Sequence, residues 1–448
     1  SATSSGLYEI TGSEVVATPG FDPGPGRFAA GPAVAVTTTT PDATVRITTD
    51  GTDPLASDPE IIAGETIDIE TSRVLKARAW KTGMSDSAVR SGFYVVTGDV
   101  AAGSGFVLGL TAAGTVVAWG GNSNGEFGNG STSSSGVPVA ASGLEDVVAV
   151  SAGESHSVAL RADGTVFCWG LNTDGQLGDG TTTRSLVPKQ VPGLSEVVAI
   201  DAGDRHTLAA KADGTVWAWG ENDYWQLGDG TTTTRTSPVQ IPVPTPVVAV
   251  AGGRYHSLVL TSDGEVWGWG WNNNGQVGDG TTTVRAAPVR VPGLIGISRI
   301  DAGQFFSLAL QTDGLEAGTL WGWGTNGYGQ IAAGEIGHSK TPVQILSRVT
   351  DMGTGPLHSL AVTQDGALWA WGAGGGARGR LGDGARLNRF APVQVQGLRD
   401  AVAVDGGGAY SVAVRADGKV FTWGYNIGDT YSDIPVPEPD LNLVDNSW

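Results

Sequence analysis

The feature that most constrains this chain is a tryptophan–glycine pair that returns at a nearly constant interval. The pair begins at Trp119, Trp169, Trp219, Trp269, Trp323, Trp371 and Trp423, so the spacings are 50, 50, 50, 54, 48 and 52 residues. An interval of this length indicates one supersecondary unit copied several times, because each copy buries its apolar surface only against its neighbours. The chain of 448 residues therefore carries seven copies of one unit.

Each copy has the same internal order. An Ala-Gly or Gly-Gly pair precedes an alternating run such as His156 to Leu160, and Asp163-Gly164 or its equivalent separates that run from the one ending in Trp-Gly. Asp-Gly between two alternating runs is a strong hairpin signal, since a type I′ turn needs positive φ at both central residues. A Gly-rich turn, a Thr-rich loop and two further β-rich runs complete a unit of about four strands without helical periodicity.

Seven four-stranded units predict an all-β fold with a seven-bladed β-propeller over residues 98–448. The last copy is cut short after Trp423. We therefore expect the C-terminal tail, Pro435 to Val444, to supply strands that the first blade lacks and so to close the ring.

Residues 13–97 lack the repeat and follow an N-terminal extension of residues 1–12. They contain short β-rich runs at Val34 to Thr38, Thr44 to Thr48, Glu65 to Ile69, Val74 to Trp80 and Gly92 to Val96. Regularly spaced strand signals of this kind predict a small β-sandwich accessory domain.

The repeat motifs resemble those of a known family. Ala-Gly-x-x-His-Ser-x-Ala-Leu, Asp-Gly-x-Val-x-x-Trp-Gly and Asn-x-x-Gly-Gln-Leu-Gly-Asp-Gly-Thr are similar to RCC1 repeats over residues 98–448. The resemblance implies a seven-bladed propeller whose loops bind proteins. Its members include a nuclear exchange factor for a small GTPase, a plant ultraviolet receptor and a secreted bacterial inhibitor of β-lactamases, so the fold alone does not carry one function.

Two of those roles fit this sequence poorly. The photoreceptor branch has a Gly-Trp-Arg-His-Thr motif, whereas this chain has Asp204 at the position of that tryptophan. The exchange factor has a basic tail for chromatin, and this chain shows none. The inhibitor role remains an alternative that the resemblance implies.

The N-terminal module also resembles a known domain. Val45 to Pro54 and Leu75 to Trp80 are similar to the chitobiase/β-hexosaminidase C-terminal type domain, which implies an accessory module of an extracellular bacterial protein. Asp50 and Asp53 have the hard oxygen ligands that calcium prefers. Asp-Gly and Asp-Pro pairs also build turns, and we favour that interpretation.

Aromatic residues that interrupt the repeat are the first candidates for binding. Trp225 stands where neighbouring copies have Gly175 and Gly275, and Trp271 follows a Trp-Gly pair directly, as Tyr425 does in the last copy. We expect Tyr224, Trp225, Trp271 and Tyr425 to lie in turns at the rim of one propeller face. Such anchors suit binding hot spots or sugar platforms, and ordinary loop cover is an equally weighted alternative.

Basic residues recur in the loop before the fourth strand. Arg184, Arg235 and Arg285 are the clearest examples, and they could form a positive rim that docks an acidic partner. We favour the simpler interpretation that they are solvated charges beside acidic neighbours.

No catalytic centre is predicted. His156, His206, His256 and His358 share one repeat position with Phe106, Phe306 and Tyr410, which indicates packing rather than a metal site. Gly-x-Ser-x-Gly is absent, and Ser155 beside His156 forms no dyad because adjacent strand residues point to opposite faces. We therefore expect no enzyme activity, no metal and no cofactor.

Charge narrows the class of partner. The net charge of −19 disfavours nucleic acid, and no apolar run reaches the roughly 20 residues of a membrane span. The single cysteine, Cys168, fixes no compartment, and the polar start is typical of a terminus left after removal of a signal peptide.

We expect an extracellular or cell-surface bacterial protein that binds a protein or glycan through its propeller loops. A self-assembling surface, filament or adhesin subunit is the alternative.

Overall fold

The computed structural model describes residues 15–22, 26–28, 33–49, 53–68, 73–96, 98–244, 246–311, 318–374, 379–425 and 431–443. The chain divides into two compact units, Ser1–Val96 and Thr97–Trp448. Within the described residues every regular element is a β-strand, and no helix could cross a membrane.

The N-terminal unit is a β-sandwich, as predicted. One sheet has the order β1 (Gly20–Asp22), β3 (Ala33–Thr37), β6 (Thr66–Asp68); the other has the order β2 (Gly26–Phe28), β8 (Arg90–Val96), β7 (Arg73–Trp80), β4 (Thr44–Thr48), β5 (Glu60–Ile61). Alternate residues such as Val34, Val36, Val45 and Leu75 are buried in one core, because side chains of period two fill the space between two sheets.

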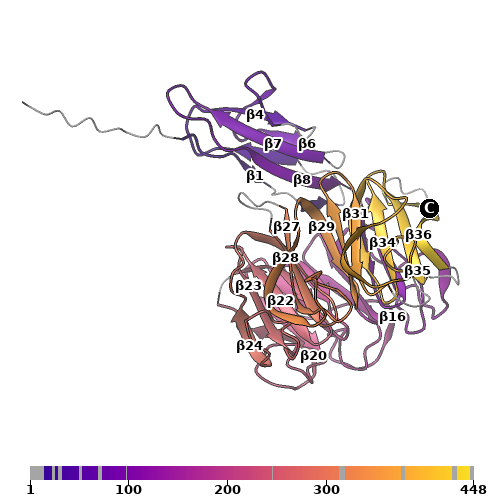
Figure 1. Ribbon diagram of the computed structural model, residues 1–448. Coiled ribbons are helices and arrows are strands. Elements are labelled where there is room, and N and C mark those ends of the chain that lie inside the picture. The colour runs from indigo at the N-terminus through magenta and orange to yellow at the C-terminus, as the bar shows by residue number, and fades with distance from the viewer. Residues whose placement is uncertain are drawn as a thin grey trace, which may run out of the picture. The chain divides into compact units, whose positions relative to one another are not determined.

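The second unit contains seven four-stranded antiparallel sheets, each built from four consecutive strands (Figure 1). The first strands are β9 (Asp99–Ala102), β13 (Val147–Ala152), β17 (Val197–Ala202), β21 (Val247–Gly252), β25 (Ile297–Ala302), β29 (Val349–Thr354) and β33 (Ala401–Gly406). The second strands are β10 (Phe106–Leu110), β14 (His156–Arg161), β18 (His206–Lys211), β22 (His256–Thr261), β26 (Phe306–Gln311), β30 (His358–Thr363) and β34 (Tyr410–Arg415).

The third and fourth strands complete each sheet outward. The third strands, which end in or just after Trp-Gly, are β11 (Val116–Gly120), β15 (Val166–Gly170), β19 (Val216–Gly220), β23 (Val266–Gly270), β27 (Thr319–Thr325), β31 (Leu368–Gly372) and β35 (Lys419–Tyr425). The fourth are β12 (Ser135–Ala140), β16 (Ser185–Gln190), β20 (Arg235–Ile241), β24 (Arg285–Arg290), β28 (His338–Leu346), β32 (Arg389–Gln394) and β36 (Tyr431–Asn442).

The first strands form a closed inner ring. Each contacts the first strand of the next sheet, and β33 of the last sheet contacts β9 of the first. This closed order of seven sheets confirms the predicted seven-bladed propeller.

The tail closes the ring differently from the expectation. Pro435 lies in β36, the outermost strand of the last sheet, and the first sheet has four strands of its own. Leu441 and Leu443 join Val107 and Trp119 of the first sheet in one apolar cluster, and Ala102 N of β9 donates to Asp405 of β33, so both packing and a hydrogen bond close the ring. The repeat explains why, since a sheet of four consecutive strands needs no strand from another copy.

The core lies between neighbouring sheets. Each repeat tryptophan is fully buried against the preceding sheet; Trp219, for example, joins the cluster of Val158 and Leu177. Its Nε1 donates to the carbonyl oxygen of Gln176 at 2.9 Å, so the indole also meets its hydrogen-bonding need. Gly228 shows how tight this packing is, because a Cβ there would lie 2.6 Å from Trp269 Nε1.

Candidate functional site

Two sets of connections leave every sheet at the same end. These are the turns between first and second strands and the loops between third and fourth strands, which share an end because neighbouring strands are antiparallel. We call this end the loop face. The site residues predicted from the sequence all lie there, at Arg184, Tyr224, Trp225, Arg235, Trp271, Arg285 and Tyr425.

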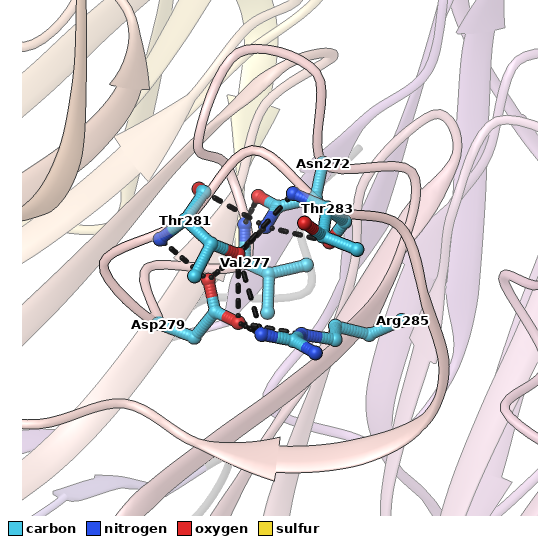
Figure 2. A network of polar contacts seen from close by, with 6 residues as sticks. All are labelled: Asn272, Val277, Asp279, Thr281, Thr283 and Arg285. Carbon is cyan, nitrogen blue, oxygen red and sulfur yellow. Dashed lines mark hydrogen bonds and ion pairs between the residues drawn. The ribbon is translucent and has the colours of Figure 1, made fainter.

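A buried asparagine organises the long loop in each of the first five sheets, as Figure 2 shows for the fourth. Asn272 Oδ1 accepts the backbone N–H of Val277 at 2.9 Å, and its Nδ2 lies 3.2 and 3.0 Å from the carbonyl oxygens of Thr281 and Thr283. Nδ2 also lies 3.1 Å from Asp279 Oδ1. The loop is therefore a fixed scaffold whose outward side chains are held in place.

The predicted arginines belong to this scaffold. Arg285 Nε donates to Asp279 Oδ2 at 2.6 Å, and Arg235 Nη2 lies 2.7 Å from Asp229 Oδ2. Burial opposes ionisation of Asp229, yet hydrogen bonds from Thr231 and Arg235 hold its pKa below the usual value. Arg235 and Arg285 are thus paired within their own loops and add no free positive charge to the face.

Arg184 differs from these two. Its Nη1 donates to the carbonyl oxygen of Ser123 at 3.2 Å, while Lys189 takes the pairing position beside Asp179 at 3.2 Å. The three arginines therefore do not form one uniform rim.

Trp225 lies half-buried in its turn with a φ of 59°. Gly175 and Gly275 occupy the same position at φ 73° and 77°. A left-handed backbone costs an L-residue roughly 1–2 kcal/mol, so the chain keeps a tryptophan where the repeat favours glycine. A strained residue of this kind directs attention to function.

The following sheet has a small residue opposite Trp225. Where this turn position is glycine, a Cβ would lie 2.7–2.9 Å from the Cα of Leu186, Thr236, Lys340 or Phe390. In the copy with Trp225 the register places Ala286 there, since Gly230 N donates to Ala286 O just as Gly180 N donates to Thr236 O. The smallest side chain of the set thus faces the largest.

Four aromatic rings, which we call the aromatic patch, gather on the loop face across three neighbouring sheets. Tyr224 lies 4.2 Å from Tyr255 and 5.0 Å from Trp271 between ring centroids, and Tyr255 lies 5.9 Å from Phe305. All four are half-buried. Edge-to-face and tilted contacts of this kind stabilise the cluster and leave ring surface exposed.

Charged residues continue the patch onto the preceding sheets. Arg205 Nε lies 2.8 Å from Glu154 Oε2, and its Nη1 lies 3.6 Å from Asp174 Oδ2. Arg254 lies over the Tyr255 ring at 4.9 Å and 3.7 Å from Asp204 Oδ2. Asp174 and Arg205 occupy the repeat positions of Tyr224 and Tyr255, so one contact is ionic in one copy and aromatic in the next.

Glu221 completes the site. Its Oε2 accepts from Gln226 Nε2 at 3.2 Å, and Gln226 Oε1 accepts from the backbone N–H of Tyr224 at 2.9 Å. Burial, reinforced by the charge of Asp174, raises the pKa of Glu221 to about 7. Burial and the charge of Glu154 raise the pKa of Asp204 to about 6.

Tyr425 does not belong to this patch. It is exposed at the end of β35 and contacts Tyr431 of β36, with ring centroids 5.1 Å apart. The structure thus brings Tyr224 and Trp271 together, sets Trp225 in the same loop as Tyr224, and places Tyr425 in another sheet.

The repeat histidines link neighbouring sheets. His156 Nε2 lies 3.1 Å from Thr207 Oγ1, which donates its own hydrogen to the carbonyl oxygen of Gln176 at 2.9 Å. Nε2 must therefore be the donor in this pair. Burial lowers the pKa of His156 to about 3.

Five acidic residues line the central channel, and three of them, Asp201, Asp301 and Asp405, lie in first strands. Asp201 accepts from Ser151 Oγ and Gly252 N at 2.7 Å each, and Asp405 accepts from Ala102 N at 2.8 Å, so they tie neighbouring first strands together. Burial and the charge of Asp201 raise the pKa of Asp301 to about 7.

No group of three or more His, Cys, Asp or Glu side chains within the described ranges is arranged to hold a metal ion. Asp53 instead lies 2.7 Å from Lys76 Nζ, and Asp50 is outside the described residues.

Sequence reasoning missed Glu221, Arg254, Tyr255 and Phe305. Tyr255 and Phe305 stand next to the repeat histidine position, in a column occupied by Ser155 and Arg205 in earlier copies. That column and the one before it vary from copy to copy, whereas the glycine that precedes both is present in all seven copies. A column-by-column comparison of the copies would have found it, because variable positions of a rigid repeat are the ones its scaffold does not need.

A closed ring of near-identical sheets with variable side chains gathered on one end defines a β-propeller scaffold protein. Residues 84–315, more than half of the chain, match the RCC1-like domain, and residues 317–362 and 365–414 match the regulator of chromosome condensation (RCC1) repeat. The chain belongs to the RCC1-like propeller family, whose fold is a protein-interaction fold. Residues 23–91 match the chitobiase/β-hexosaminidase C-terminal domain, which confirms the resemblance of the N-terminal unit.

Curated relatives share part of the propeller. The chain is 33% identical over 135 residues to the mitochondrial RCC1 domain-containing protein RUG3 of Arabidopsis thaliana, covering 29% of this chain and 30% of RUG3. It is 31% identical over 117 residues to the ultraviolet-B receptor UVR8 of the same plant, covering 25% and 26%. It is 36% identical over 115 residues to the human E3 ubiquitin-protein ligase HERC2, covering 24% and 2%. The matches span less than a third of each relative.

Solved structures show the same fold. Prp20p of Saccharomyces cerevisiae aligns with a TM-score of 0.62 at 22% identity, covering 71% of this chain and 84% of that one. Human WBSCR16 aligns with a TM-score of 0.62 at 22% identity, covering 83% and 99%.

Proposed function

We propose that this protein is a non-catalytic binding protein that engages a protein partner through the loop face of its propeller. The observation that carries the proposal is the aromatic patch, where Tyr224, Tyr255, Trp271 and Phe305 meet across three sheets. Half-buried tyrosine and tryptophan on a rigid support are the residues that dominate protein interfaces. RCC1-like propellers are generally non-catalytic regulators or binders, and the yeast relative Prp20p binds Gsp1p and histones.

The backbone strain at Trp225 also supports the loop face as the binding surface. An unstrained copy of this turn is encoded several times in the same chain, with glycine at the position of Trp225. Retaining a tryptophan there is explained by a use for its indole, since the scaffold folds without it elsewhere.

We also propose that the protein acts outside the cell, at the surface or in the medium of a bacterium. Its N-terminal unit matches the chitobiase/β-hexosaminidase C-terminal domain, and the resemblance implies an accessory module of extracellular proteins. Fractionation of native cells tests this location, and retention of the protein in the cytoplasm would contradict it.

The binding function is tested by site-specific cross-linking. A photoreactive phenylalanine derivative is placed at Tyr224 or, as a control, at Ile295, which is 79% exposed at the opposite end of the first strands. We expect a partner cross-linked from position 224 and not from position 295. With that partner purified, Trp271→Leu should weaken binding about tenfold or more without lowering the melting temperature, because Leu171 holds the equivalent position in another copy. Cross-links only from position 295 would refute the assignment of the face.

A further inference from the structure

The acids around the aromatic patch outnumber the bases. Five carboxylates border the patch, those of Glu154, Asp174, Asp204, Glu221 and Asp223, against the two guanidinium groups of Arg205 and Arg254. Both arginines are already paired, Arg205 with two acids and Arg254 with one. The loop face therefore has a local excess of negative charge beside its exposed rings.

Glu221 is the acid best placed to receive a cation. It is half-buried, and in the described part of the chain it forms no ion pair. The amide of Gln226 bonds both to Glu221 and to the backbone of Tyr224, so the carboxylate and the aromatic patch are fixed to one another. A half-buried carboxylate without a direct ion pair is under-stabilised, because it has lost water and gained one neutral donor, while the charges of Arg205 and Arg254 act on it only from a distance.

Resting on the proposed function, we infer that the loop face binds an extended protein segment through a lysine or arginine side chain, which lies against Tyr224 and Trp271 and pairs with Glu221. An aromatic face attracts a cation electrostatically, and a neighbouring carboxylate adds an ion pair in a partly desolvated place. A neutral glycan would cover the rings and leave the acid excess uncompensated, so the charge pattern favours a basic protein segment.

This pairing makes binding depend on pH near neutrality. Glu221 is surrounded by Asp174 and Asp223, which raise its pKa, and by Arg205 and Arg254, which lower it; burial is the largest cause, and the result is about 7. A carboxyl group of that pKa is about 10% ionised at pH 6 and about 90% at pH 8. Only the ionised form pairs with a cation, so affinity should rise about tenfold between these values.

The probe is a peptide of glycine, serine and arginine with tetramethylrhodamine on its N-terminus and an amidated C-terminus, so that neither its side chains nor its label titrates between pH 6 and 8. Binding is followed by fluorescence anisotropy at low ionic strength, with a glutamate-for-arginine peptide as the reference. For the intact protein we expect the arginine peptide to bind about tenfold more tightly at pH 8 than at pH 6, and the glutamate peptide not to bind.

Three variants make the test specific. Glu221→Gln should weaken binding at pH 8 about tenfold and reduce the pH dependence to about twofold or less, the part that Asp204 with its pKa of about 6 can supply. Trp271→Leu should weaken binding at both pH values and keep the full dependence. Glu145→Gln, in an exposed turn at the opposite end of the first strands, should change neither. Thermal melts of all variants report on folding.

Several results would overturn the inference. These are an arginine peptide that fails to bind, equal binding of the glutamate peptide, or a tenfold pH dependence that survives Glu221→Gln. Binding of neutral oligosaccharides that is lost in Trp271→Leu would replace the basic segment with a glycan. None of these results changes the cross-linking from Tyr224, so a failure of this inference is distinguishable from a failure of the proposed function.

Discussion

Trp225 offers a direct test of the strain argument, because two substitutions at this position separate the backbone from the side chain. Trp225→Gly and Trp225→Ala both remove the indole and differ by one methyl group. At a φ of 59° the Cβ of an L-residue costs roughly 1–2 kcal/mol, whereas glycine at an ordinary position is about 0.5–1 kcal/mol less stable than alanine. The two effects leave glycine more stable than alanine by about 1 kcal/mol.

The measurement is thermal unfolding of the two variants by calorimetry. A difference of about 1 kcal/mol corresponds to about 1–2 °C in Tm for a cooperative unit as large as the propeller. Trp271 supplies the matched control, since it stands in the same face without a positive φ. There Trp271→Ala should melt above Trp271→Gly. If alanine is also the more stable residue at position 225, the backbone is not strained and the argument for a functional indole loses its physical basis.

Three further outcomes follow from the scaffold. His256→Phe introduces the residue found at this position in two other sheets. Burial lowers the pKa of His256 to about 3, whereas the unfolded chain takes up a proton at this histidine below about pH 6.5. Between pH 7.5 and 4.5 the variant should therefore gain about 2–3 kcal/mol of stability relative to the intact protein, and a Tm difference that does not change with pH would contradict this. Asn272→Ala should lower the free energy of unfolding in urea by about 2–3 kcal/mol, because it removes the hydrogen bonds that organise the loop. Asn273→Ala, at an exposed neighbour, should change it by less than about 0.5 kcal/mol. Equal effects of the two substitutions would show that the loop network does not contribute. Leu443→Ala should cost about 2–4 kcal/mol of stability, because this side chain is fully buried where the first and last sheets meet. Val436→Ala, on the exposed edge strand, should cost less than about 1 kcal/mol. Similar melting temperatures of the two variants would show that Leu443 does not contribute to closing the ring.

The repeat made the fold predictable. Seven Trp-Gly pairs at about 50 residues, with Asp-Gly hairpins between them, left little choice other than a ring of four-stranded sheets. The closure of the ring was predicted wrongly, because sequence shows that the last copy is short but not which sheet its tail joins. The structure adds Pro435 and its neighbours to the last sheet and closes the ring by packing Leu443 against the first.

The candidate site was predictable only in part. Tyr224, Trp225 and Trp271 were recognisable because each interrupts a repeat, whereas Tyr255, Phe305 and their charged neighbours were not singled out. For the arginines, the favoured prediction of loop charges beside acidic neighbours agrees with the pairing of Arg235 and Arg285, although the sequence marked their acidic partners only as turn formers. Arg285 and Asp279 pair because the loop folds back on the asparagine beneath it.

The sequence by itself determined the number of sheets, the strands within each sheet apart from the C-terminal strand β36, and the position of every buried tryptophan, because these depend on periodicity and on contacts within one copy or between adjacent copies. The tertiary structure alone decided which variable residues meet. Tyr224, Tyr255 and Phe305 come from different copies and touch only because the sheets stand side by side around an axis. The tertiary structure likewise determines the ionisation of Glu221, since the pKa of this residue depends on its burial and on Asp174 from the preceding sheet.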